Sequence, residues 1–492
     1  MGCTPGQQRC IDTLSGAVVV SAGAGSGKTF TLTRRIVNAL ESGFISDVSE
    51  LLAITFTSKA AGEIKSRVKG ALRAAGMPEQ ALRVDGSWIS TIHGMCARIL
   101  RENALELGVS PTFEVADEAV SAPLLDAAIE EALACCDAGS SGSFAELFSE
   151  YRAHGAASMG DLSSVDGMVR ALIGRMSANP AGLDALRMRV DGACSAVVLA
   201  DRICDTARAA MQIASAQKAG ASRDAFISAT EEAVAGIEAH LAAGKVCARD
   251  LVALVASLPV PSRRFGTAEC KDAMEQFALD YAECALEARL LVAEPAAEEL
   301  VALAEAAMAS YARRKRELGL LDNDDLLVMA SRAFAEHPEI EQRYASRFKL
   351  VMVDEFQDTD QQQVDMIKRL SGEDCERLCT VGDAQQSIYR FRGADVSVYR
   401  RHLDFVASKD ADGVIVLPHN FRSHADVLSF VDRVFEQPSV FGGSFMSLSP
   451  ARDEARVPAP FRGEGPRIEV QLTTRPFRGV SAEEGTRIAA GR

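Results

Sequence analysis

Long apolar runs are missing from this sequence. None approaches the roughly 18 to 20 residues that a membrane-spanning helix needs, so we expect no insertion into a membrane. The first residues also lack the basic stretch and apolar core of an export signal. The twelve cysteines include no C-x-x-C pair, which predicts reduced thiols in a cytoplasmic protein and argues against a zinc or iron–sulfur site.

An excess of positive charge is missing too. The chain has 53 lysines and arginines against 68 aspartates and glutamates, which gives a formal net charge of -15. A protein that coats nucleic acid through bulk charge carries the opposite balance, so that class is excluded. Any nucleic-acid site in this chain must therefore be a local groove.

The sequence does contain a repeated strand-then-helix pattern. Its 492 residues exceed the roughly 250 to 300 at which single cores stop growing, so two or more domains are expected. Short apolar segments predict strands at residues 17–20, 51–56, 88–92, 350–353, 378–381 and 414–417. Strands that alternate with helices predict a parallel sheet. Between residues 117 and 316 the composition changes to Ala, Glu and Leu, which predicts a helical insertion.

A glycine-rich loop follows the first predicted strand. It fits the phosphate-loop pattern, except that Ala22 replaces the usual first glycine. In such loops backbone N–H groups surround phosphate oxygens, while Lys28 would reach the terminal phosphates and the Thr29 hydroxyl would ligate Mg²⁺. The alternative is a flexible turn that happens to precede a lysine. The residues expected to contact ATP are Ala22, Gly23, Ala24, Gly25, Ser26, Gly27, Lys28 and Thr29.

An acidic pair follows the strand predicted at residues 350–353, at the edge where α/β proteins place their ligand sites. Asp354 would hold Mg²⁺, and Glu355 would orient or deprotonate the attacking water. Acidic pairs are also commonly solvated or cap helices, and residues 358–360 offer capping side chains for the helix that follows. Both roles can coexist.

Together with five other segments, these two resemble the motifs of the UvrD/Rep group of superfamily 1 DNA helicases, in the family's order. Residues 4–7, Thr-Pro-Gly-Gln, resemble the Q motif. The segments that resemble motifs Ia, Ib, III and IV lie at residues 54–61, 90–94, 381–394 and 417–423. The string at 381–394 is the most family-specific of them. The insertion matches nothing specific.

The resemblance implies further nucleotide contacts. Gln7 would read the adenine edge, and Gln386 and Arg392 would approach the terminal phosphate. Phe421 would stack on adenine, where many relatives have tyrosine. Arg422 would be the arginine finger that supplies positive charge as the phosphoryl group leaves. The expected catalytic residues are Lys28, Glu355, Gln386 and Arg422.

The same resemblance implies a path for a single DNA strand. Phe56 would stack on a base, and Tyr389 and Phe391 would also face the DNA. His93 would touch the backbone. Core packing is the alternative for Tyr389 and Phe391, strand-end packing for Phe56, and an ordinary surface position for His93. Because Gln386 and Tyr389 share one loop, hydrolysis could change how bases stack.

Two charged segments receive structural interpretations. Residues 321–327 resemble the acidic element that precedes motif II in the family, but Asp322 is better explained as a helix cap. The basic run at 313–316 could follow phosphates. Such runs are more commonly solvated helix faces, so we leave it out of the site.

The predicted fold is α/β: a RecA-like P-loop NTPase domain with a parallel sheet, a large helical insertion, and the start of a second RecA-like domain. Motor domain 1A is expected in two pieces, at residues 1–112 and 317–412. A 1B-like insertion is expected at 113–316, and the start of a 2A-like domain at 413–492.

The expected function is an ATP-dependent DNA helicase or translocase of the UvrD/Rep type, moving 3′-to-5′ on single-stranded DNA in repair or recombination. No string after Ser423 matches motifs V and VI, so we expect a truncated or degenerate motor. The alternatives are an ATP-switched DNA-binding module and a non-unwinding fragment of an AddA/RecB-type helicase–nuclease, which would have an AddB-like partner subunit. Single-stranded and duplex DNA are the expected partners. An unrelated phosphate-loop ATPase would not respond to DNA.

Overall fold

The chain forms two compact units, Met1–Phe113 with Asn323–Arg492, and Glu114–Asp322. The computed structural model describes residues 2–139, 164–176, 195–244, 248–259, 265–372, 374–389, 394–441 and 445–451, together with Leu147, Ala153 and Leu162. The second unit starts one residue after the insertion predicted at 113–316 and ends six residues after it. None of the described helices combines the length and apolarity needed to cross a membrane.

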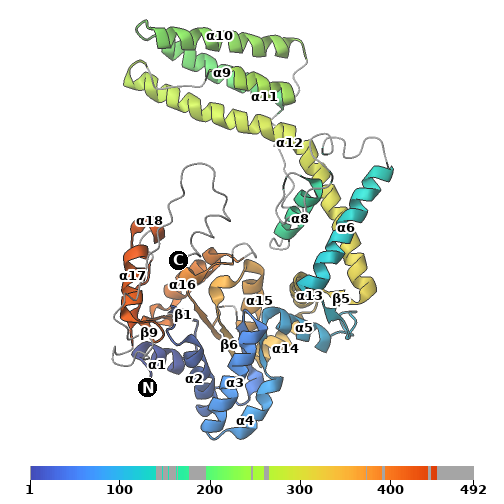
Figure 1. The fold of residues 1–492 in the computed structure, drawn as a ribbon, viewed down its shortest axis with the longest axis vertical. Coiled ribbons are helices and arrows are strands. Elements are labelled where there is room, and N and C mark those ends of the chain that lie inside the picture. The colour runs from blue at the N-terminus through green and yellow to red at the C-terminus, as the bar shows by residue number, and fades with distance from the viewer. Residues whose placement is uncertain are drawn as a thin grey trace, which may run out of the picture. The chain divides into compact units, whose positions relative to one another are not determined.

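One six-stranded sheet forms the centre of the first unit (Figure 1). Its strands are β1 (Val18–Ala22), β2 (Leu51–Thr55), β3 (Trp88–Thr91), β6 (Leu350–Val353), β7 (Leu378–Gly382) and β8 (Val414–Leu417). The strand order is β3-β2-β6-β7-β1-β8, and every neighbouring pair is parallel. All six strands match segments predicted from the sequence, so the α/β class with a parallel sheet is confirmed.

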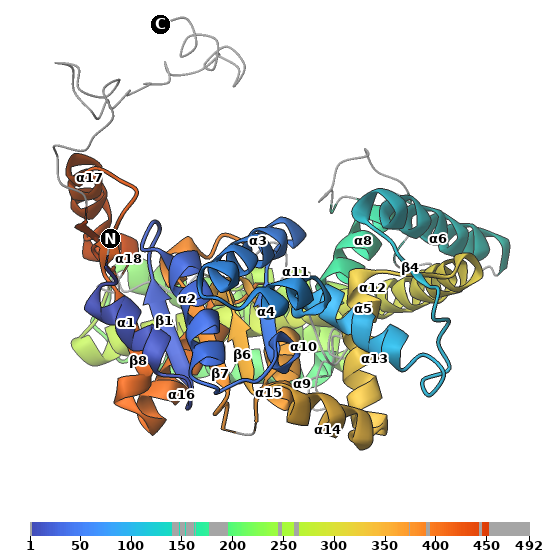
Figure 2. The same cartoon turned by 90° about the horizontal axis from the view of Figure 1, so that it is seen from below.

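Helices cover both faces of this sheet because its central strands are apolar on both sides. β2, β6 and β7 are buried along their whole length. Figures 1 and 2 show α2 (Lys28–Glu41) and α3 (Ser58–Ala74) on one face, and α15 (Gln361–Ser371) and α16 (Val396–Lys409) on the other. On α3 the buried residues Ile64, Val68 and Leu72 recur every four residues, which is the spacing of one helix face.

Side-chain caps determine where the helices next to the site begin. An N-cap side chain accepts a hydrogen bond from a backbone N–H that has no partner within the helix. The caps are Thr4 for α1 (Pro5–Asp12), Thr57 for α3, Thr91 for α5 (Ile92–Glu102) and Asp360 for α15. The capping role predicted for residues 358–360 is therefore confirmed for Asp360.

The described part of the second unit is mostly helical, and most of its buried apolar residues form two clusters. Its described helices are α6 (Glu118–Gly139), α8 (Val165–Met176), α9 (Ala196–Ser215), α10 (Ala221–Ala242), α11 (Ala248–Ser257) and α12 (Ala268–Leu318). One cluster joins α9, α10 and α11 to the first half of α12, and the other joins α6 and α8 to its second half. The 51-residue helix α12 thus belongs to both clusters.

Pro295 lies inside α12, between the parts that enter the two clusters. Proline removes one helical hydrogen bond and crowds the preceding turn, which bends a helix. Figure 1 shows α12 changing direction near its middle. At the base of this unit β4 (Glu114–Val115) pairs in parallel with β5 (Leu320–Leu321). The first and last residues of the unit therefore lie next to this short ribbon.

The structure differs from the prediction that a second domain begins at residue 413. β8 pairs with β1, so this segment completes the first sheet. The physical reason is that β1 would otherwise be an edge strand, and Ile415 and Leu417 are buried against it. The chain then enters β9 (His419–Asn420), which pairs with β10 (Ser449–Pro450), and α17 (Ala425–Phe435).

Candidate nucleotide and nucleic-acid site

The loop between β1 and α2 has a backbone that favours glycine. Gly25 and Gly27 have φ angles of 72° and 86°, in the left-handed region. A Cβ on Gly25 would lie 2.7 Å from the Cβ of Arg422. A Cβ on Gly27 would lie 2.8 Å from the amide nitrogen of Gln7. The predicted phosphate loop is therefore packed between the predicted Q motif and motif IV.

Two other loop positions bear on phosphate binding. Ala22, which replaces the usual first glycine, is the last residue of β1 and pairs with Leu417, so its extended backbone accepts a Cβ. Ser26 is buried, and its hydroxyl has no partner within the described part of the chain. Buried hydroxyls normally make hydrogen bonds, so this group is available to a phosphate oxygen at the N-terminus of α2.

Gln7 ties the predicted Q motif to the phosphate loop. Its Oε1 accepts a hydrogen bond from the Thr4 backbone N–H at 3.0 Å, which is part of the cap of α1. Its Nε2 donates to the carbonyl oxygen of Ser26 at 3.0 Å. Both ends of the amide are thus occupied by protein groups. The second N–H of Nε2 and the second lone pair of Oε1 can still bond to an adenine edge.

Lys28 and Glu355 meet at the carboxyl edge of the sheet. Lys28 Nζ lies 2.7 Å from Glu355 Oε2, although the two residues are 327 positions apart in the sequence. The Lys28 side chain is 12% exposed and that of Glu355 34% exposed, so the pair is partly shielded but open to a ligand. Glu355 has a φ of 54°, which non-glycine residues adopt at a cost and which recurs at functional sites.

Two further carboxylates crowd this pair. Burial, followed by the charge of Glu355, raises the pKa of Asp354 to about 6. The same two causes raise the pKa of Asp358 to about 6. Asp354 at the end of β6 and Thr29 at the start of α2 offer the oxygen ligands that Mg²⁺ prefers. A bound cation would relieve the repulsion among these carboxylates, so the donor set fits the predicted metal.

A hydrogen-bond network links the acidic motif to the loop after β7. The Gln357 amide contacts the side chain of Glu355 and the backbone of Asp383. Gln386 Nε2 donates to Asp383 Oδ2 at 2.6 Å. The predicted catalytic residue Gln386 therefore bonds within its own loop. Sequence reasoning missed Gln357, although an amide among the acidic residues 354–358 was a visible signal.

Two predicted DNA-binding residues stack on each other. The rings of Phe56 and Tyr389 lie 4.8 Å apart between centroids, with an interplanar angle of 26°. Phe56 is 37% exposed, so the pair is not buried core. His93 lies half-buried in the first turn of α5, next to the cap residue Thr91. Phe391 and Arg392 lie outside the described residues.

The segment predicted as motif IV lies directly against the phosphate loop. Asn420 Nδ2 donates to the Ala24 carbonyl oxygen at 2.6 Å, and the Phe421 backbone N–H donates to Gly25 at 2.8 Å. The Asn420 side-chain oxygen accepts a hydrogen bond from the Arg422 N–H at 2.8 Å. The Arg422 side chain is exposed. Sequence reasoning did not single out Asn420, whose buried side chain orients its neighbour.

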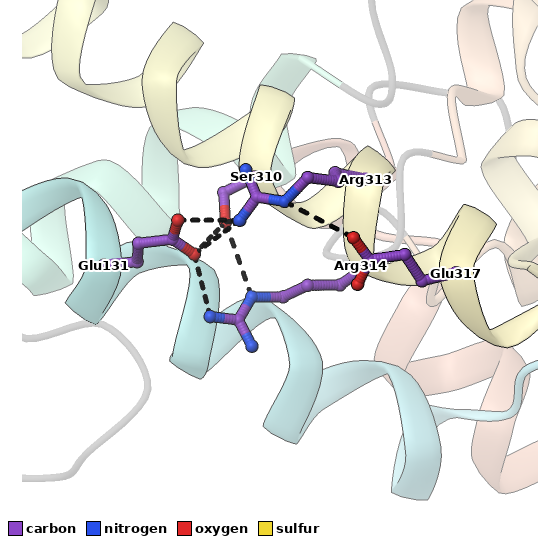
Figure 3. Close-up of polar contacts among 5 residues, drawn as sticks. All are labelled: Glu131, Ser310, Arg313, Arg314 and Glu317. Atoms are coloured by element: carbon purple, nitrogen blue, oxygen red, sulfur yellow. Dashed lines mark hydrogen bonds and ion pairs between the residues drawn. The ribbon is translucent and has the colours of Figure 1, made fainter.

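Arg313 and Arg314, the first two residues of the basic run at 313–316, are paired with an acidic residue (Figure 3). Arg313 and Arg314 of α12 both contact the Glu131 carboxylate of α6, at 2.7 Å and 2.8 Å. Hydrogen bonds from Ser310 and then from these two arginines lower the pKa of Glu131 to about 2. These two arginines stabilise the packing of α6 on α12, whereas Arg316 is exposed, so the interpretation of the run as a solvated face holds for only part of it.

Lys315 and Asp322 form a second, more buried pair in the same region. Lys315 Nζ lies 2.6 Å from Asp322 Oδ2, and the side chains are 6% and 15% exposed. The Tyr311 hydroxyl donates to the same Asp322 oxygen at 2.9 Å. The Asp322 carboxylate, which the sequence assigned to a helix cap, is thus engaged by α12.

A family model, the UvrD/REP helicase N-terminal domain, matches residues 3–405 of this chain. The chain is 26% identical over 493 residues to an ATP-dependent helicase/nuclease subunit of Staphylococcus aureus (strain JH9), covering 88% of this chain and 39% of that protein. It is 27% identical over 497 residues to the protein of the same name from Pelotomaculum thermopropionicum, covering 89% of this chain and 38% of that protein.

A second kind of relative is similar to the same extent. The ATP-dependent DNA helicase PcrA of Bacillus subtilis is 25% identical over 438 residues, covering 89% of this chain and 40% of that protein. The chain therefore spans about two fifths of the length of the curated relatives that it matches.

Proposed function

Because this chain belongs to the UvrD/REP helicase N-terminal domain family, we propose that it is an ATP-dependent DNA translocase that moves 3′-to-5′ on single-stranded DNA. The observation that carries this proposal is the contact of 2.7 Å between Lys28 and Glu355. It brings the phosphate loop and the acidic motif together at one edge of the sheet. A glycine-rich turn that preceded a lysine by chance would have no reason to place that lysine against Glu355.

The residues of this edge have complementary roles in hydrolysis. Lys28 binds the terminal phosphates, and in doing so it exchanges its contact with Glu355 for phosphate oxygens. The carboxylate of Glu355 is then available to orient or deprotonate the attacking water. Thr29 and Asp354 would hold Mg²⁺, which would neutralise charge on the phosphates. Gln386 and Arg422 face the transferred phosphoryl group.

The stacked pair of Phe56 and Tyr389 supports a DNA strand along the same edge. Exposed aromatic rings bind bases without regard to sequence, because every base has a stacking face. The net charge of -15 favours such a local contact over a broad electrostatic one. His93 contributes a backbone contact at the start of α5.

The wider assignment follows the relatives. Their names place them among helicase/nuclease subunits and DNA helicases, so a role in DNA repair or recombination in the cytoplasm is proposed for this chain as well. If the chain belongs to the helicase/nuclease branch, its partner is an AddB-like protein. The alternative function is a module whose DNA affinity changes with ATP but which does not unwind.

ATP hydrolysis with and without oligo(dT) tests the proposal. We expect the wild-type chain to hydrolyse Mg–ATP faster when oligo(dT) is present. Lys28→Ala and Glu355→Gln should each lower turnover by about 100-fold or more, because each removes a charged group aimed at the reaction. Both variants should bind oligo(dT) as the wild type does.

The outcomes separate the candidate functions. Binding of both ligands without turnover would identify the ATP-switched module, and turnover that ignores DNA would identify an unrelated ATPase. Arg313→Ala is the matched control, since it removes a positive charge in the second unit that is paired with Glu131. Its turnover should equal that of the wild type.

A further inference from the structure

Gln357 connects the nucleotide side of the site to its DNA side. We propose that Gln357 is a positioning residue that transmits nucleotide binding at Lys28 and Glu355 to the loop carrying Tyr389. This inference rests on the proposed function and adds to it a specific route. Gln357 itself touches neither ligand in that scheme, because it is 1% exposed and lies behind the site.

The contacts of Gln357 reach in both directions. Its Nε2 donates to Glu355 Oε2 at 3.0 Å and to Asp358 Oδ2 at 3.3 Å. Its Oε1 accepts a hydrogen bond from the Asp383 backbone N–H at 2.9 Å. Its backbone carbonyl accepts one from the Ser387 hydroxyl at 3.3 Å. One buried residue therefore holds the acidic motif with one end and the loop after β7 with the other.

The chemistry of these partners fixes the orientation of the amide. Glu355 and Asp358 offer carboxylate oxygens, which accept from the NH₂ group, whereas the Asp383 N–H can only donate to the carbonyl oxygen. A glutamate at position 357 could still accept the hydrogen bond from the Asp383 N–H. Its ionised carboxylate would, however, repel the carboxylates of Glu355 and Asp358. The glutamine amide satisfies both directions at neutral pH, because it carries a donor group and an acceptor and no charge.

Gly382 leaves room for this connection. A Cβ at that position would lie 2.8 Å from Gln357 Oε1 and 2.9 Å from the Tyr399 ring, so a larger residue would displace the amide. The glycine has no left-handed backbone to explain it. The close approach of Gln357 therefore gives a physical reason for the glycine at the end of β7.

The route from nucleotide to DNA runs through shared acceptors. Glu355 Oε2 accepts from both Lys28 Nζ and Gln357 Nε2, so movement of Lys28 toward a phosphate changes the charge that Gln357 faces. At the other end Asp383 also holds Gln386, which begins the stretch leading to Tyr389. A movement of the Gln357 amide therefore displaces the loop that carries Tyr389, whose ring stacks on Phe56.

Thermodynamic coupling between the two ligands tests this route without requiring turnover. The affinity of fluorescent oligo(dT) is measured with and without Mg–AMPPNP, a non-hydrolysable ATP analogue, and the ratio of the two dissociation constants is the coupling factor. We expect the wild-type factor to be at least about fivefold. Gln357→Ala should bring it close to one, while the affinity for each ligand alone changes by less than about threefold.

Two more variants distinguish positioning from general damage. Gln357→Glu should also lose coupling near pH 8, and should regain it toward about pH 6 as the buried acid takes up a proton and can donate again. Glu355, Asp358 and Asp383 face that position, so each value is divided by the wild-type value at the same pH. Gln361→Ala is the control, because that amide bonds to Asp365 on the surface of α15.

Different results overturn different claims. If Gln357→Ala folds and keeps the wild-type coupling factor, the positioning role is wrong. The role is also wrong if the wild type binds both ligands without coupling, or if Gln357→Glu stays uncoupled at both pH values while Gln357→Ala is unfolded. If the wild type binds neither ligand, the proposed function itself fails. Fluorescence of Trp88, the one tryptophan of the chain, checks folding in each variant.

Discussion

Burial determines the charge state of the carboxylates behind the phosphate loop. Asp354 and Asp358 both have a pKa of about 6, against an ordinary value of 3.8, so the folded protein binds their protons more tightly than the unfolded chain does. Their contribution to stability is therefore complete below about pH 4 and is lost as the pH rises through about 6. At neutral pH the site holds negative charge that a cation would stabilise.

A charge-removing variant should expose this cost. The effect of Asp354→Asn is the free energy of unfolding of the variant minus that of the wild type. This difference should be more positive at pH 7.5 than at pH 4 by on the order of 2 kcal/mol. Urea unfolding followed by Trp88 fluorescence measures the difference for the first unit. The low pKa of buried His402, about 4, adds an opposite trend that cancels when wild type and variant are compared at the same pH. Asp404→Asn, on the exposed side of α16, should show no such change with pH.

Sequence patterns identified single residues but not the bonds between them. The sequence predicts Lys28 and Glu355 as separate site residues, and likewise Phe56 and Tyr389. The structure brings the two members of each pair into contact. Gln357 and Asn420 are not among the predicted site residues. The role of a buried amide depends on its hydrogen-bond partners. For Gln357 and Asn420 these partners lie in segments that are distant in the sequence and come close only in the folded sheet.

The positions of strands and helices in the sequence were more predictable than the elements that they pair with or pack against. All six strands of the sheet follow from short apolar runs, and the signal is strongest for β2, β6 and β7, which are buried on both faces. The place of β8 beside β1 did not follow, since pairing partners depend on which edge is free. In the second unit the composition indicated helices, whereas the division of α12 between two clusters depends on packing that periodicity does not reveal.

The two clusters along α12 should open independently of each other. Phe277 is buried in the cluster with α9 to α11, and Leu303 in the cluster with α6 and α8, with Pro295 between them. Phe277→Ala should cost about 3 to 5 kcal/mol locally and speed amide hydrogen exchange in α9 to α11. Exchange in α6 and α8 should stay unchanged, and Leu303→Ala should give the reverse pattern.

Hydrogen exchange measured by mass spectrometry reads both halves in one experiment. Leu286→Ala is the control, because this α12 side chain is 57% exposed. If Phe277→Ala accelerated exchange in α6 and α8 as strongly as in α9 to α11, α12 would act as one cooperative element despite its proline.

At the scale of the whole molecule, two units share one chain and one of them contains the only tryptophan. Trp88 is buried in β3, where it contacts the rings of Tyr344 and Phe348 and the Arg98 guanidinium, so its fluorescence reports on the first unit. Far-ultraviolet circular dichroism reports on helices in both units. The two signals therefore follow different parts of the molecule.

Unfolding in urea should not be a single transition. We expect the helical signal to begin falling before Trp88 fluorescence changes, because the apolar core of the second unit is divided into two clusters. The measurement is a urea titration followed by both signals on the same samples. Curves that coincide over the whole range would mean that the two units unfold together.

The pairing of β4 with β5 has a consequence for engineering of this protein. Glu114 lies opposite Leu320 and Val115 opposite Leu321, so the chain leaves the first unit and returns to it at points one strand spacing apart. Two chain ends held this close together can be joined by segments of different length at a small cost in loop-closure entropy. We therefore expect that a different module whose two ends lie equally close together can replace the second unit while the sheet of the first unit stays folded.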